Sequence, residues 1–204
     1  MTVAADTPVR SAATVILWRK NAGEVQVLMG QRGANAAFMP SKYVFPGGAV
    51  DKGDTVDPLP LGATCLRRLT LACSVDAPTP AAIAGAALRE LLEETGLRLQ
   101  TGVSSALTFF FRAITPPGRT RRFDARFFLA DASLVTGDLD DFSGAEDELS
   151  HLHWIGLAEA KALDLPFITE VVLSEVTAHF AGTKDEGVPF FDNSGDVPQF
   201  RRLV

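Results

Sequence analysis

The chain has 204 residues, of which 47% are hydrophobic and 22% are charged, with 19 Lys and Arg against 25 Asp and Glu. These proportions are those of a globular protein and exclude a fibrous or largely disordered chain. The formal net charge of −6 argues against binding to duplex nucleic acid, which relies on Lys and Arg to neutralise phosphates. No apolar run approaches the roughly 18 residues of a membrane-spanning helix, so we expect a cytoplasmic protein with one domain over residues 1–204.

The first part of the chain predicts strands. Two β-rich runs, 13–18 and 24–29, flank a turn-like segment at 20–23 and together predict a hairpin. A short strand at 43–45 runs into Pro46-Gly47-Gly48. At these glycines the chain must bend or approach a ligand closely.

Residues 55–80 differ from the rest, because four prolines there bracket a stretch at 65–73 that can form a short helix. A stronger helix is expected at 81–95, where good helix formers end at Gly96. Strands and helices then mix without regular βα alternation, which favours a mixed sheet covered by helices over a doubly wound parallel sheet. The remaining expected elements are strands at 107–114, 122–130 and 152–155 and helices at 157–163 and 168–180.

Three carboxylates share one face of the predicted 81–95 helix, because Glu90, Glu93 and Glu94 are spaced i, i+3, i+4. Carboxylates this close raise one another's pKa unless cations neutralise them, and Mg²⁺ takes oxygen ligands of this kind. A solvated acidic face is the alternative for this segment taken alone. The pair Gly47-Gly48 favours the metal site, since glycines leave backbone groups free to approach a metal or a phosphate.

Together these segments resemble the Nudix box, the signature of the Nudix hydrolases, which reads Gly-x5-Glu-x7-Arg-Glu-U-x-Glu-Glu-x-Gly-U with U an aliphatic residue. Residues 89–97 match its second half at every specified position, Gly48 matches the opening glycine, and Asp54 stands in place of the first glutamate. Between Asp54 and Arg89 lie 34 residues where the box has seven. The chain therefore resembles a branch with an interrupted box, which includes a mammalian peroxisomal coenzyme A diphosphatase. The likeness extends to residues 38–40, 122–128 and 148–154.

The resemblance implies an α/β fold, a Nudix-type α/β/α sandwich with a mixed β-sheet. It also implies metal-dependent hydrolysis of a diphosphate linkage in a small-molecule nucleotide. The first candidate substrate is coenzyme A or an acyl-CoA, giving 3',5'-ADP and a phosphopantetheine product. ADP-ribose or a nucleotide sugar is the alternative substrate, and a non-catalytic Nudix ligand-sensing domain is an alternative of another class. The predicted partners include no membrane and a possible homodimer.

Position in the motif implies roles for five residues. The Gly47 carbonyl and the carboxylates of Glu90, Glu93 and Glu94 would hold Mg²⁺ or Mn²⁺, and Arg89 would pair with the carboxylates. Asp54 is expected to matter less directly, because the insert makes its placement uncertain.

The general base in this family often lies outside the box, and Glu146 and Glu148 are the candidates here, with a solvated acidic loop as the alternative. His151 and His153 are further candidates by their pKa, and strand alternation would place both on one face. For phosphate binding, the candidates are Arg32, Arg121, Arg122 and Arg126, although surface charge explains them nearly as well.

We predict two further features. The insert at about 55–80 shapes substrate choice, with Leu66, Leu69 and Leu71 docking its helix and Arg67 and Arg68 available for an additional phosphate; a stabilising segment remote from the site is the alternative. The run 109–111 belongs to the core, with Phe109 and Phe111 on one side of the sheet and Phe110 on the other.

Overall fold

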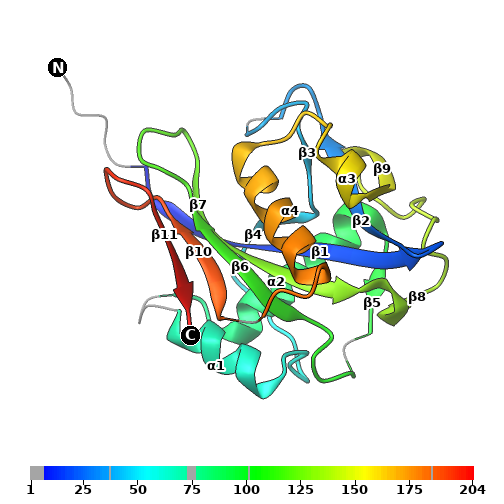
Figure 1. Cartoon of the computed structure of the whole chain (residues 1–204), viewed down its shortest axis with the longest axis horizontal. Coiled ribbons are helices and arrows are strands. Elements are labelled where there is room, and N and C mark those ends of the chain that lie inside the picture. Colours follow the sequence, from blue (N-terminus) through cyan, green and yellow to red (C-terminus); the bar gives the residue numbers. More distant parts are fainter. Residues whose placement is uncertain (1–6, 37, 73–76, 101, 185) are drawn as a thin grey trace.

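A computed structural model describes residues 7–36, 38–72, 77–100, 102–184 and 186–204 (Figure 1). Its strands are β1 (Val9–Asn21), β2 (Glu24–Arg32), β3 (Tyr43–Val44), β4 (Gly47–Ala49), β5 (Arg98–Leu99), β6 (Thr108–Ile114), β7 (Arg122–Asp131), β8 (Val135–Thr136), β9 (Leu149–Gly156), β10 (Val188–Asp192) and β11 (Gln199–Leu203). Its helices are α1 (Ala63–Leu71), α2 (Pro80–Thr95), α3 (Leu157–Ala160) and α4 (Phe167–Phe180), with one 3₁₀ turn, η1 (Ala132–Leu134). Within these ranges, none of the helices has the length and apolar character needed to cross a bilayer.

A large mixed sheet forms the centre of the molecule. Within the described residues it has nine strands, in the order β11-β10-β6-β7-β1-β2-β3, with β4 paired to β1 and β9 paired to β2. The pairs β1–β7 and β10–β6 are parallel, and the other pairs in this sheet are antiparallel. The mixed sheet and the 13–29 hairpin are therefore confirmed. The short strands β5 and β8 pair separately.

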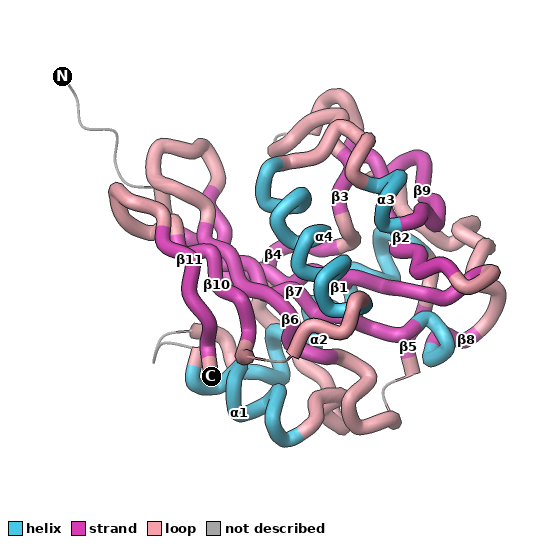
Figure 2. The backbone as a smooth tube through the Cα atoms, viewed as in Figure 1, coloured by secondary structure: helices cyan, strands magenta, loops and turns pink. Residues whose placement is uncertain are grey.

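Helices cover both faces of this sheet, with α4 in front and α2 behind in the view of Figures 1 and 2. Alternation along β1 supplies both faces: Ala13, Val15 and Leu17 pack in a cluster with residues of α2, whereas Ile16 packs in a cluster with residues of α4. This arrangement is the predicted α/β/α sandwich.

Helix α2 has the predicted bounds within one residue, and each end has a local cause. The Thr79 side chain accepts a hydrogen bond from the Ala82 N–H at 3.2 Å, and Pro80 occupies the first turn, where no intrahelical N–H is needed. At the other end Gly96 has a φ of 75°, a left-handed conformation that glycine adopts without strain. In the middle, a Cβ on Gly85 would come within 2.6 Å of the Thr55 backbone N. The chain that leaves the glycine turn is thus packed directly on α2.

The insert docks helix α1 on the face of the sheet that bears α2. Leu69 is fully buried and Leu66 packs partly against the same cluster, as predicted, but Leu71 is 71% exposed. The expectation for Leu71 was wrong, because two residues of helix rotate it away from Leu69 toward solvent. The helix begins two residues earlier than predicted, and Cys73, the last residue of the predicted stretch, lies outside the described residues.

Replacing Leu69 with Ala is expected to destabilise the protein by about 2–5 kcal/mol, because the change leaves a cavity under α1. The matched control is Leu71→Ala, which removes the same atoms from an exposed position of the same helix and should change the stability little. Urea unfolding of the two variants measures the difference. Equal midpoints would show that α1 does not depend on its contact with the core.

Two β-bulges alter the alternation that the sequence predicts. In the β6–β7 pair, Phe109 lies opposite Phe128 and Phe111 opposite Phe127, so β6 carries one extra residue between them. Phe109 consequently packs on the α2 side and Phe111 on the α4 side, which corrects the expectation that both point one way. In the β2–β9 pair the register shifts between Met29 and Gln31.

Candidate active site

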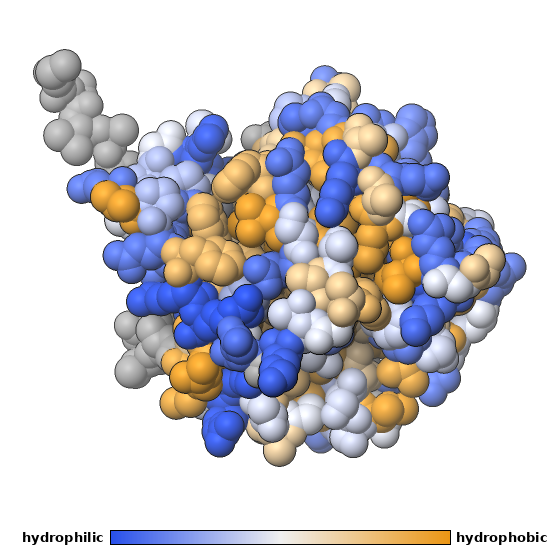
Figure 3. Space-filling model, viewed as in Figure 1, coloured by the Kyte–Doolittle hydropathy of each residue, from blue (hydrophilic) through white to orange (hydrophobic). Residues whose placement is uncertain are grey.

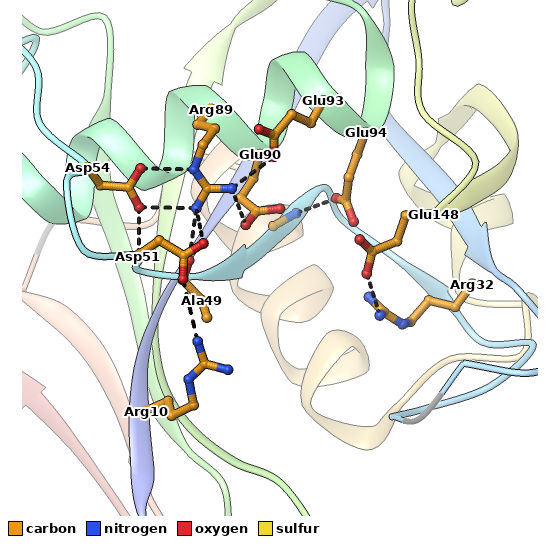
Figure 4. A network of polar contacts seen from close by, with 11 residues as sticks. Arg10, Arg32, Ala49, Asp51, Asp54, Arg89, Glu90, Glu93, Glu94 and Glu148 are labelled. Atoms are coloured by element: carbon orange, nitrogen blue, oxygen red, sulfur yellow. Dashed lines mark hydrogen bonds and ion pairs between the residues drawn. The ribbon is translucent and has the colours of Figure 1, made fainter.

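Arg89 on α2 is the centre of a polar network (Figure 4). Its Nε and Nη2 donate to the two carboxylate oxygens of Asp54, at 2.8 and 3.1 Å, and Nη2 also donates to the Ala49 carbonyl at 3.0 Å. Its Nη1 donates to Glu90 and to Glu93, both at 2.8 Å. Every nitrogen of the guanidinium is used, so Arg89 sets the orientation of three carboxylates at once, as its position in the motif implied.

Asp54 is held more firmly than expected. Its side chain is only 7% exposed, and the hydrogen bonds from Arg89 hold its pKa below the ordinary value. The expectation of an uncertain placement was wrong, because the insert starts after Asp54 and the next residue, Thr55, lies against Gly85 of α2. The shorter carboxylate therefore reaches the arginine despite the 34 intervening residues.

The glycine turn lies so close to β1 and to α2 that no side chain fits there. A Cβ on Gly47 would come within 2.6 Å of the Ala13 carbonyl oxygen, and a Cβ on Gly48 would collide with the Glu90 carboxylate. With no side chain in the way, the Gly47 N–H donates to Glu94 Oε2 at 2.7 Å. The two halves of the motif therefore meet in space, as Figure 4 shows.

Burial strongly perturbs two of the carboxylates. The pKa of Glu94 is raised to about 8, mainly by desolvation and also by the negative charges of Glu90 and Glu148. The hydrogen bond from the Gly47 N–H acts in the opposite direction and lowers this pKa. Desolvation also raises the pKa of Glu90, against its hydrogen bond from Arg89. Oε1 of Glu94 is buried and has no hydrogen-bond partner among the described residues. A buried carboxylate oxygen of this kind is costly unless a cation or a proton satisfies it.

These carboxylates fit a hard divalent cation by their chemistry. In the described part of the chain, no three Asp, Glu, His or Cys side chains already converge as a metal site. Glu90 and Glu93 are turned toward Arg89, and Glu94 is turned toward Gly47. The possible metal ligands are nevertheless all oxygen atoms, as Mg²⁺ prefers. A divalent cation would be stabilised most at the unpartnered Oε1 of Glu94, because the negative charges of Glu90 and Glu148 lie close to it.

A cavity of about 960 Å³ adjoins the carboxylates on the α4 side of the sheet. Its wall uses alternate residues of the strands, such as Phe123, Ala125 and Phe127 of β7, together with the beginning of α4. In Figure 3 apolar residues gather in the hollow between the lobe of the β6–β7 loop and the lobe of α4. The aromatic residues of the wall are Phe38, Phe45, Phe123, Phe127, Phe167 and Phe191.

Of the two candidate bases, the structure brings only Glu148 into the cavity. Glu148 lies near Glu90 and Glu94, lines the cavity, and accepts a hydrogen bond from Arg32 at 2.9 Å. Glu146 is tied to α2 through its backbone, with its N–H donating to the Glu93 carbonyl at 2.7 Å, and its exposed side chain does not line the cavity.

The histidine candidates lie away from the site. His151 sits at the β9 irregularity with a φ of 50°, so the simple alternation that placed both histidines on one face does not hold there. His153 Nδ1 lies 2.7 Å from the His151 carbonyl oxygen, and its ring packs edge-on against Tyr43. Neither histidine lines the cavity.

Only two of the four arginines predicted to bind phosphate lie at the cavity. Arg32 and Arg121 line the cavity, whereas Arg122 and Arg126 are buried and lie outside its wall. Arg126 pairs with Asp124 at 2.9 Å, and the structure places neither Arg122 nor Arg126 at the cavity wall, where the predicted phosphate-binding role would need them. Residues 122, 124 and 126 alternate with the residues of β7 that line the cavity and therefore face away from it.

Sequence reasoning missed several cavity residues and misplaced the insert. Arg10 and Arg119 line the cavity but belong to no motif, and only the folded sheet brings them there. No described residue between 52 and 89 lines it, so the described part of the insert, with Arg67 and Arg68, lies outside the cavity wall. The insert instead packs through α1 against α2 and β6, away from the cavity, which favours the stabilising alternative.

Comparisons with known proteins agree with this geometry. Residues 80–176 match the family model described as NUDIX domain, and the match begins at the first residue of α2. A Caenorhabditis elegans protein named "Putative nudix hydrolase 7" is 56% identical over 45 residues, which are 22% of this chain and 15% of that protein. The matched segment thus spans far less than two thirds of that relative.

Solved structures with a similar fold superpose over most of the chain. A NUDIX hydrolase from Alicyclobacillus acidocaldarius is 25% identical with a TM-score of 0.57, over 82% of this chain and 90% of that one. The C. elegans Ap4A hydrolase binary complex has a TM-score of 0.56 at 20% identity, over 86% and 100% of the two chains. The NUDIX domain of Shewanella oneidensis NrtR, complexed with ADP ribose, has a TM-score of 0.56 at 14% identity, over 85% and 90%. The NUDIX domain model thus matches residues 80–176, somewhat less than half of the chain, and the chain shares the fold of these solved NUDIX structures.

Proposed function

We propose that the protein is a metal-dependent Nudix hydrolase that cleaves a diphosphate linkage in a nucleoside diphosphate derivative. The observation that carries this proposal is the buried, unpartnered oxygen of Glu94 beside Glu90 and Glu148, both of which line a cavity of about 960 Å³. A divalent metal ion bound there would lower the pKa of a bound water and offset the charge of the diphosphate. The matches to NUDIX hydrolases support the same reaction class.

Each residue of the network has a distinct task in this proposal. Glu90, Glu93, Glu94 and the Gly47 carbonyl would hold Mg²⁺ or Mn²⁺. Arg89 positions two of these carboxylates and is itself fixed by Asp54. The Gly47 N–H directs one oxygen of Glu94 toward the glycine turn and leaves the other for the cation.

Glu148 is the proposed general base, because it alone of the candidates lines the cavity close to the carboxylate cluster. We expect Glu148→Gln to lower kcat by roughly 10²-fold while changing KM little, since the substitution removes proton acceptance but retains the shape of the side chain. Steady-state kinetics at saturating Mg²⁺ checks this expectation. Glu146→Gln is the matched control, because its side chain lies outside the cavity; an equal loss in both variants would reject the assignment.

Coenzyme A or an acyl-CoA is the first substrate to test, and ADP-ribose is the alternative. The cavity volume is near the upper end for small-molecule sites, and its aromatic wall suits a long, partly apolar substrate. Incubation with coenzyme A, ADP-ribose and a nucleotide sugar, with Mg²⁺ or Mn²⁺, followed by mass spectrometry of the products, tests the proposal. Binding of these compounds without any hydrolysis would instead identify a ligand-sensing domain.

A further inference from the structure

We propose that Trp154 and Arg19 are positioning residues for the reaction and that they act on Glu148 through residues 137–148. These residues, which we call the strap, join β8 to β9 and end on the proposed base (Figure 1). The inference rests on the proposed function, because Glu148 has a catalytic task only there. Neither Trp154 nor Arg19 lines the cavity, so we place their effect on the base and not on a bound substrate.

Side chains of β1 and β9 hold the beginning of the strap. The Nε1–H of Trp154 donates to the Leu139 carbonyl at 3.0 Å. Nη1 of Arg19 donates to the two carboxylate oxygens of Asp140 at 3.0 and 3.2 Å. The Arg19 guanidinium also lies over the Trp154 ring, 4.5 Å from its centroid, and its Nε donates to Gln26 Oε1 at 3.0 Å. Two consecutive residues of the strap, Leu139 and Asp140, are therefore held by side chains that contact each other.

The end of the strap is held against the last turn of α2. The Glu146 N–H donates to the Glu93 carbonyl at 2.7 Å and so satisfies a carbonyl that a helix end leaves without an intrahelical partner. Gly96 lies so close to the strap that a Cβ on it would be 3.0 Å from the Gly144 backbone. Glu148 follows Glu146 by two residues. The proposed base is therefore tied to the turn of α2 that bears two of the proposed metal ligands.

The middle of the strap is packed, so its two ends are mechanically connected. The side chains of Leu139 and Phe142 pack against the buried cluster on the α2 side of the sheet, as the Trp154 ring does. The Phe142 carbonyl accepts a hydrogen bond from the Ala145 N–H at 3.0 Å. Close-packed segments transmit a displacement because they deform little. A strap released at Leu139 is therefore expected to shift at the end that carries Glu148.

The two ends of the strap lie well apart along the sheet. Trp154 pairs with Leu28, and Leu149, the residue after Glu148, pairs with Arg32. The two partners on β2 are separated by four residues, which span about 13 Å at roughly 3.3 Å per residue. The indole is thus too far from the base for a direct hydrogen bond, and its influence is carried by the intervening chain.

Two substitutions weaken the beginning of the strap without entering the cavity. Trp154→Phe keeps an aromatic ring against the core and removes the N–H that holds Leu139. Arg19→Met removes the pair with Asp140 and keeps an apolar side chain beside the indole. With Mg²⁺ and whichever of coenzyme A and ADP-ribose the unmodified protein cleaves, we expect each variant to lower kcat about 5- to 10-fold. KM should stay unchanged, because a slightly displaced base loses part of its contribution while substrate binding is intact.

The second tryptophan of the chain supplies the matched control. Trp18 packs on Phe180 of α4, on the opposite side of the sheet, with ring centroids 4.7 Å apart. Trp18→Phe makes the same chemical change away from the strap and should leave kcat unchanged. Equal kcat values for Trp154→Phe, Arg19→Met and the unmodified protein would overturn the inference while the hydrolase function stands.

A double-substitution cycle distinguishes positioning of the base from a general structural role. In the Glu148→Gln background the base is already absent, so Trp154→Phe and Arg19→Met should change kcat less than about 2-fold. A structural role independent of the base would lower kcat by the same factor in both backgrounds. That result would reject the inference even if the single variants lose activity.

Hydrogen exchange tests the strap without catalysis. The Glu146 amide should exchange at least ~10-fold faster in Trp154→Phe, because its bond to the Glu93 carbonyl opens more often. The Val15 amide of β1, which donates to the Pro46 carbonyl, should keep its rate and shows that the fold is intact. Equal exchange of the Glu146 amide in the two proteins would contradict the inference. Absence of hydrolysis by the unmodified protein would instead reject the proposed function, whereas exchange still decides whether Trp154 holds the strap.

Discussion

Replacing Glu94 with Gln is expected to lower kcat/KM by on the order of 10²- to 10³-fold, the size of effect produced by loss of one electrostatic group in other active sites. The substitution keeps the volume and retains an oxygen to accept the Gly47 hydrogen bond, but it removes the charge needed to hold a divalent cation. Glu159→Gln on α3 is the matched control, because Glu159 is exposed and lies outside the cavity. Near-normal turnover of Glu94→Gln at saturating Mg²⁺ would reject the assignment of the metal site.

The same variant should remove a pH dependence of stability. The folded protein without metal keeps Glu94 protonated up to a pKa of about 8, whereas the unfolded chain loses this proton near the ordinary value of 4.5. The free energy of unfolding should therefore fall as the pH rises between these two values. Because Mg²⁺ competes with the proton, its stabilising effect should grow from pH 6 to pH 8.5. Thermal unfolding with and without Mg²⁺ measures both effects; an equal Mg²⁺ shift in Glu94→Gln would contradict the explanation.

Asp54→Asn is expected to lower kcat by about 10- to 100-fold, although we place Asp54 outside the metal ligands. Asp54 forms two hydrogen bonds with Arg89, and Arg89 orients Glu90 and Glu93 through its remaining donors. The guanidinium of Arg89 donates to both carboxylate oxygens of Asp54, but an asparagine side chain has only one oxygen to accept a hydrogen bond. The substitution should therefore leave Arg89 without its fixed position. Kinetics over a range of Mg²⁺ concentrations should show a weaker dependence of activity on the metal.

Two further variants make this result interpretable. Asp54→Glu introduces the residue usual at this place in the motif and should retain most of the activity if charge pairing is what matters. Asp147→Asn removes an exposed carboxylate outside the cavity and should change neither activity nor Mg²⁺ dependence. If Asp54→Asn matches Asp147→Asn, the position of Arg89 does not depend on Asp54.

Local patterns were sufficient for the elements whose causes lie within a few residues. The hairpin at the N-terminus, the bounds of α2, its stop at Gly96 and the shared face of three glutamates all follow from short-range spacing and backbone preference. The glycine pair was correctly singled out, because glycine is the residue that allows close backbone approach. The strands β10 and β11 were missed; β10 depends on pairing with β6, a contact between residues some 78 positions apart such as Phe190 and Arg112.

Some features of the candidate site could be predicted from the sequence, whereas others depend on the tertiary structure. The resemblance of the sequence to the Nudix box singled out Arg89, the three glutamates and Gly47 as candidates, with Glu146 and Glu148 as candidate bases, and their roles stay predictions. Only the folded chain showed that Asp54 reaches Arg89 across the insert, that the insert lies away from the cavity, and that Arg119 rather than Arg122 or Arg126 lines it. The physical reason is that side-chain direction in a sheet depends on strand parity and register, and one bulge or one residue of shift reverses it.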